Sequence, residues 1–74
     1  MRKTFYQFLM TQRNPEPNDE VEEFANQAFF DQSFPKQDRD FEEISKYLEL
    51  NGSYLQNMTI FDQAWQRYLE SEQN

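Results

Sequence analysis

The sequence predicts an all-α fold, a compact orthogonal bundle of four short helices. Apolar residues recur at the three- and four-residue spacing of an amphipathic helix in four separate segments. No β-branched run alternates with polar residues, as it would in a half-buried strand. The segments are too short for a long parallel bundle, so we expect crossed packing around one core. We expect helices at about residues 4–12, 19–31, 40–50 and 59–70, within a single domain of residues 1–74.

The first expected helix begins at a capping box. Thr4 precedes the apolar pattern and Gln7 follows three residues later, which lets each side chain bond to the other residue's backbone N–H. Phe5, Phe8 and Leu9 then share one helix face. The connector that follows contains two prolines, which prevent the helix from continuing.

The second expected helix is capped by Asn18 or Asp19 and has acidic residues near its positive N-terminal end. Its predicted apolar stripe is Val21, Phe24, Ala25, Ala28 and Phe29. Phe30 falls off this stripe, and Pro35 stops any continuation of the helix. The segment between the second and third helices is therefore expected to be extended around Phe34.

The third and fourth expected helices carry similar signals. Asp40 and Thr59 are the predicted caps, and Gly52 suits a left-handed position after the third helix. The apolar stripes are Phe41, Ile44, Tyr47 and Leu48 in the third helix, and Phe61, Ala64, Trp65, Tyr68 and Leu69 in the fourth. The chain as a whole has eight phenylalanines, four tyrosines and one tryptophan, so aromatic rings must supply much of a small core.

The composition argues against several functions. The chain has neither histidine nor cysteine, which removes the common general base, the thiolate nucleophile and the usual zinc ligands. A single glycine leaves no glycine-rich loop for a phosphate. Asp31, Asp38 and Asp40 lack the ligand spacing of an EF-hand. We therefore expect a protein that is not an enzyme, with no catalytic residues, no cofactor and no metal site.

The charge balance limits the possible partners. Seven basic residues face fourteen acidic ones, a net charge of −7, which repels phosphate backbones and anionic lipid. No apolar run approaches the length that spans a membrane. We expect a cytoplasmic protein without membrane association.

Several segments together resemble the YozE-like family of short uncharacterised proteins from Gram-positive bacteria. The segments are MRKTFYQFLM at 1–10, ANQAFFD at 25–31, SFPK at 33–36, EISKYLE at 43–49 and FDQAWQRYL at 61–69. The resemblance covers nearly the whole chain. It implies a SAM-like (sterile-alpha-motif-like) helical bundle, in agreement with the periodicity, and it implies no activity.

Aromatic residues outside the helical stripes have two interpretations. In the first, a small orthogonal core uses side chains from several directions. In the second, an exposed patch binds a protein partner or another copy of the chain. The candidate partner-binding residues are Phe30, Phe34, Pro35, Lys36 and Arg39.

Nucleic-acid binding is the alternative function. It requires the basic residues near the first and third helices to lie together as a small positive patch on an acidic body. These residues are Arg2, Lys3, Lys36 and Arg39. A helix-turn-helix fits poorly, because the connector before the third helix is about twice the usual 3–4 residues.

Overall fold

The computed structural model describes residues 3–73, which form four α-helices and no strand. The helices are α1 (Phe5–Met10), α2 (Glu20–Phe29), α3 (Phe41–Asn51) and α4 (Met58–Glu72). The predicted all-α fold class is confirmed. None of the helices in the described residues is long and apolar enough to cross a membrane.

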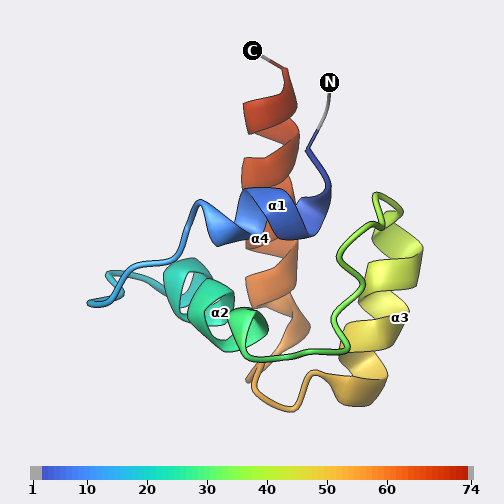
Figure 1. The fold of residues 1–74 in the computed structure, drawn as a ribbon, viewed down its shortest axis with the longest axis horizontal. Coiled ribbons are helices and arrows are strands. Elements are labelled where there is room, and N and C mark those ends of the chain that lie inside the picture. Colours follow the sequence, from blue (N-terminus) through green and yellow to red (C-terminus); the bar gives the residue numbers. More distant parts are fainter. Residues whose placement is uncertain (1–2, 74) are drawn as a thin grey trace.

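The other three helices pack on α4. It contacts α1, α2 and α3, and α1 also contacts α2. Figure 1 shows α1 crossing α4, with α2 and α3 on opposite sides of the N-terminal half of α4. The helices therefore cross rather than run parallel, as short helices around a common core are expected to do.

The N-terminal caps explain where the first three helices begin. The Gln7 backbone N–H donates to Thr4 Oγ1 at 3.2 Å, and the Thr4 N–H donates to Gln7 Oε1 at 2.9 Å, so the predicted capping box is present. Asp19 and Asp40 each accept a backbone N–H from the first turn of α2 and α3. Short polar side chains thus fix the starts of these three helices.

Every helix differs from its expected range by one or two residues at its ends, and α2 stops at Phe29 and α4 continues to Glu72. α4 begins at Met58 because Asn57, rather than Thr59, is its cap and accepts the Thr59 N–H. α1 ends two residues earlier than expected. The Thr11 hydroxyl donates to the Phe8 carbonyl at 2.6 Å, a local bond that competes with continuation of the helix.

Gly52 ends α3, but not in the predicted left-handed conformation. Its φ is −94° and its ψ is 51°. The Gly52 N–H donates to the Leu48 carbonyl at 2.8 Å, and a Cβ on Gly52 would lie 2.7 Å from that same oxygen. Glycine is needed here because the backbone passes so close to the last turn of α3 that a Cβ would clash. It is not needed to allow a positive φ.

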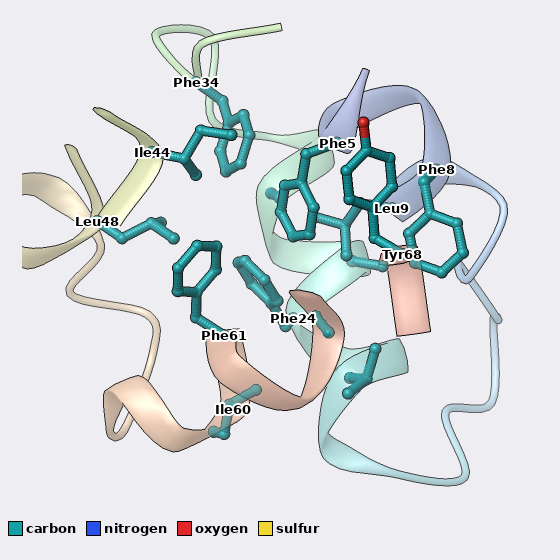
Figure 2. Packing of buried hydrophobic residues seen from close by; sticks show 14 residues of the cluster. Phe5, Phe8, Leu9, Phe24, Phe34, Ile44, Leu48, Ile60, Phe61 and Tyr68 are labelled. Carbon is teal, nitrogen blue, oxygen red and sulfur yellow. The ribbon is translucent and has the colours of Figure 1, made fainter. Parts of the chain in front are cut away.

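The core is one cluster of aromatic and aliphatic side chains centred on Phe5, which is fully buried. The Phe5 ring meets Phe61 and Tyr68 edge-on, with centroids 5.5 Å and 5.7 Å away. Figure 2 shows this cluster between the four helices, with Ile44 and Leu48 contributed by α3. The buried apolar residues are Phe5, Phe8, Leu9, Val21, Phe24, Ala25, Ala28, Phe34, Ile44, Leu48, Ile60, Phe61, Ala64 and Tyr68.

Candidate functional site

Phe34 is a core residue, so its predicted place in an exposed docking patch is wrong. Only 3% of its surface is exposed. Its ring lies 6.4 Å from the Phe5 ring and 5.4 Å from the Tyr6 ring, both on α1. It also meets Tyr47 of α3 at 5.8 Å. Phe34 therefore fills the space between α1 and α3, as Figure 2 shows beside Ile44.

Pro35 and Lys36 line a different part of the surface from Phe30. Pro35 is half-buried, and Lys36 and Arg39 are exposed. The Lys36 ammonium donates to the Gln32 carbonyl at 3.1 Å and lies 5.4 Å from the centre of the Tyr6 ring. Pro35 and Lys36 line a shallow hollow that does not include Phe30. The five predicted partner-binding residues therefore do not form one surface.

Phe30, at the C-terminal end of α2, is the one aromatic residue among the five predicted partner-binding residues whose side chain is exposed. It is 75% exposed, and its ring meets that of Phe29, itself 44% exposed, edge-on at 5.2 Å. The Arg13 guanidinium lies over the Phe29 ring, 3.6 Å from its centre. We call Arg13, Pro15, Phe29 and Phe30 the Phe30 surface.

The exposure of Phe29 corrects the predicted stripe of α2. At about 100° per residue, Ala28 points within roughly 20° of Val21, whereas Phe29 points roughly 80° away. Ala28 is accordingly buried and Phe29 is not. An i+8 position can lie at the edge of an apolar face, and here the ring turns towards Arg13.

The proline-containing connector is fixed against α2 by polar side chains. The Asn14 N–H donates to Asn26 Oδ1 at 3.2 Å, and Asn26 Nδ2 donates to the Asn14 carbonyl at 2.8 Å. Glu22 Oε1 accepts from Asn14 Nδ2 and from the Asn18 N–H. These bonds hold the connector in place and so keep Arg13 over Phe29.

Phe30 lies between two hollows. The first is lined by Arg13, Asn14, Pro15, Asn26 and Phe30. The second is lined by Gln27, Phe30, Asp31, Asn51 and Tyr54. An exposed ring between two concave areas has the shape of an anchor that a partner can surround.

Residues 4–70 match a family model described as the YozE SAM-like fold. The chain belongs to this family. A UPF0346 protein of Pediococcus pentosaceus is 80% identical over 73 residues, which cover 99% of both chains. A UPF0346 protein of Lactiplantibacillus plantarum is 68% identical over 72 residues, covering 97% of this chain and 99% of the relative. The names of these relatives state no activity.

A solved structure agrees with the fold. The solution NMR structure of the UPF0346 protein yozE from Bacillus subtilis matches with a TM-score of 0.80 at 55% identity. The match covers 89% of this chain and 80% of that chain. Both the predicted resemblance and the predicted SAM-like bundle are thus confirmed for this member of the YozE SAM-like family.

Asp31 is the shared acceptor of several hydrogen bonds in this YozE SAM-like chain, and we call it the polar hub. This role was not predicted from the sequence. The Tyr47 hydroxyl from α3 donates to both Asp31 carboxylate oxygens, at 2.8 Å and 2.6 Å. The Tyr54 hydroxyl, from the loop before α4, donates to Oδ2 at 2.8 Å. The Ser33 N–H donates to Oδ1 at 3.1 Å. Asp31 therefore links the end of α2 to α3 and to the loop that follows α3.

The acidic residues considered for a cation site accept hydrogen bonds from other parts of the chain. Asp31 accepts the two tyrosine hydroxyls, Asp38 accepts the Asp40 N–H, and Asp40 caps α3. Within residues 3–73, no three acidic side chains lie close enough together to hold a metal ion.

The hydrogen bonds from Tyr47 and Tyr54 to Asp31 predict that the stability of the fold decreases at high pH. Burial raises the pKa of the Tyr47 hydroxyl to about 12, and the hydrogen bond and negative charge of Asp31 add to this effect. The same causes, burial first, raise the pKa of Tyr54 above its ordinary 10.0. The folded pKa values lie above the unfolded ones, so this stabilisation is complete below about pH 10 and is lost as the pH rises through about 12.

We therefore expect the free energy of unfolding to fall more steeply from about pH 10 to 12 in the wild type than in a Tyr47→Phe/Tyr54→Phe variant. Urea titrations at several pH values measure both slopes. The two proteins share every other side chain, so the difference between the slopes isolates this pair. Equal slopes would show that the two hydroxyls do not couple to stability.

A groove between α2 and the loop before α4 is another feature that was not predicted from the sequence. Its lining is Glu20, Glu23, Phe24, Gln27, Tyr54, Leu55, Gln56 and Ile60. A signal for it was present in the sequence, because Glu20, Glu23, Gln27 and Phe30 recur at helical spacing on a second face of α2. The opposite wall of the groove is formed by residues that are distant from α2 in the sequence, so helical periodicity cannot predict their position.

Proposed function

We propose that this protein is a small, non-catalytic protein–protein interaction module, and that it binds its partner through the Phe30 surface. The observation that carries the proposal is the 75% exposure of Phe30, a large aromatic side chain beside a second partly exposed ring. Binding hot spots are enriched in aromatic and arginine side chains, and both lie here. Covering these rings would remove apolar area from water, which favours association.

The rigidity of this surface supports the proposal. The paired bonds between Asn14 and Asn26 fix the connector that carries Arg13. The guanidinium then packs on Phe29 and limits the freedom of both side chains. A surface ordered before binding has less side-chain entropy to lose when the partner arrives.

The chemistry of the chain is in keeping with a non-catalytic role. Without histidine or cysteine, a nucleophile would need a carboxylate or a lysine as its base. The hydroxyls of Tyr47 and Tyr54, whose pKa values are raised, already donate to Asp31 and are poor candidates for a base near neutral pH. We place the interaction in the cytoplasm.

Nucleic-acid binding through a basic patch remains the alternative outcome of the test. Lys36 lies over the Tyr6 ring of α1, close in sequence to Lys3, which favours a shared face for these two residues. Arg2 lies outside the described residues. The net charge of −7 weakens any such contact.

Capture from a lysate tests the proposal. Wild-type protein, Phe30→Gln and Leu50→Gln are immobilised and exposed to Pediococcus pentosaceus lysate, with and without nuclease. Leu50 is the matched control because it is 84% exposed on α3. We expect the wild type and Leu50→Gln to retain a common protein for which Phe30→Gln has about thirtyfold lower affinity, because loss of a hot spot costs about 2 kcal/mol or more. Both substitutions should leave stability within about 0.5 kcal/mol.

Equal retention by the two variants would refute the role of Phe30. Recovery of nucleic acid alone, removed by nuclease, would support the alternative. Light scattering of the purified protein over a range of concentrations identifies the case in which the retained protein is a second copy of the chain.

A further inference from the structure

We propose that the groove beside α2 binds an extended, cationic segment of the partner, in which basic residues alternate with apolar ones. This inference rests on the proposed function, because it specifies the chemistry of the protein that meets Phe30. The α2 groove is the set Glu20, Glu23, Phe24, Gln27, Tyr54, Leu55, Gln56 and Ile60. Three features of the groove support the proposal. It leads to the Phe30 surface, its floor is apolar, and its exposed edge, or rim, is acidic.

The α2 groove leads directly to the Phe30 surface. It shares Gln27 and Tyr54 with the hollow that Phe30 lines. Glu20, Gln27 and Phe30 lie along one face of α2, at about 1.5 Å of rise per residue, so the path from Glu20 to Phe30 is roughly 15 Å long. An extended segment of about five or six residues covers that distance.

The floor of the groove is apolar and narrow. Phe24 and Ile60 form it and are 2% and 6% exposed, while Tyr54 and Leu55 are half-buried walls. The enclosed volume is about 50 Å³, room for the end of a side chain rather than for a metabolite. Successive side chains of an extended segment point to opposite sides, so one row can enter the floor while the other reaches the rim.

The rim of the groove is acidic, so it favours a positively charged segment of the partner. Glu20 and Glu23 are exposed, and in the described part of the chain neither carboxylate is engaged by a basic side chain. Among residues 3–73, no lysine or arginine lines this groove or the hollow next to it. Asp31 adds a third carboxylate near Phe30. A segment with lysine or arginine in its outward row meets complementary charge along the whole path, whereas an acidic segment is repelled.

Peptide binding tests this inference directly. The probe is a fluorescein-labelled peptide of about six residues with alternating lysine and leucine, and glutamate replaces lysine in the control peptide. Anisotropy is measured with wild type, Glu20→Lys/Glu23→Lys and Glu42→Lys/Glu43→Lys. The last variant is the matched control, because it changes the net charge equally and also replaces two exposed first-turn glutamates, here on α3.

We expect wild type and Glu42→Lys/Glu43→Lys to bind the lysine peptide with affinities within about twofold of each other. Glu20→Lys/Glu23→Lys should bind about tenfold more weakly, because two exposed ion pairs are replaced by repulsions. Amide chemical shifts should move at Glu20, Gln27 and Tyr54 when the lysine peptide is added. Thermal unfolding of the two double variants checks that both remain folded.

Three results would overturn the inference: no binding of the lysine peptide, equal weakening in both double variants, or shifts confined to other faces. The lysate experiment separates the two proposals. If Phe30→Gln loses the captured protein while Glu20→Lys/Glu23→Lys keeps it, the Phe30 surface stands and the cationic segment fails. If both variants keep it, the proposed function fails as well.

Discussion

Replacing Phe5 by alanine is expected to lower the free energy of unfolding by about 3–5 kcal/mol, the usual cost of truncating a buried phenylalanine. Phe5 is fully buried. Its ring lies within 6.4 Å of Phe24, Phe34, Phe61, Trp65 and Tyr68. A cavity at this position removes contacts with α2, with α4 and with the segment between α2 and α3. A domain of this size has a total stability of about 4–11 kcal/mol, so the variant should be close to unfolded.

Urea denaturation followed by far-ultraviolet circular dichroism measures this loss. Phe30→Ala is the control, since it deletes the same ring from a position that is 75% exposed. It should change stability by no more than about 0.5 kcal/mol. If the two substitutions lowered the urea midpoint equally, Phe5 would not be the centre of the core.

The sequence was sufficient for the fold class because helical periodicity reports burial directly. Phe5, Phe8 and Leu9 share one predicted face of α1, and all three are buried. On α4, Phe61 and Tyr68 are buried at their predicted positions. Such a pattern depends only on the geometry of one helix, which is fixed by the backbone.

The position of Phe34 was beyond this reasoning because it lies outside the helices. A residue in an irregular segment has no periodicity, and its burial depends on the path of the chain between α2 and α3. Of the two interpretations given to the off-stripe aromatics, the core interpretation holds for Phe34, while Phe30 is exposed as the patch interpretation expected. The two residues are only four apart, so their difference arises from tertiary structure rather than composition.

The candidate site was predicted only in part for the same reason. The off-stripe position of Phe30 was visible in the sequence. The neighbours of Phe30 were not, because Arg13 comes from the connector before α2 and Tyr54 from the loop before α4. Lys36 was predicted to belong to the same partner-binding patch as Phe30, yet its ammonium lies over the Tyr6 ring.

The second large effect is expected for Asp31→Ala, which should lower the free energy of unfolding by about 2–3 kcal/mol. Hydrogen bonds to a charged acceptor contribute about 1.5–3 kcal/mol each, and water partly replaces those at half-buried hydroxyls. The substitution removes the acceptor of both Tyr47 and Tyr54. It also removes the Asx-type bond to the Ser33 N–H, which helps to turn the chain after α2.

A double-mutant cycle isolates this effect. In the Tyr47→Phe/Tyr54→Phe background the acceptor has lost both donors, so Asp31→Ala should then cost less than about 1 kcal/mol. The same loss in both backgrounds would show that Asp31 acts through something other than the tyrosines. Because Tyr54 is also a wall of the α2 groove, Asp31→Ala should weaken binding of the lysine peptide even where the protein remains folded. The hub would then support both the fold and the surface that we propose for binding.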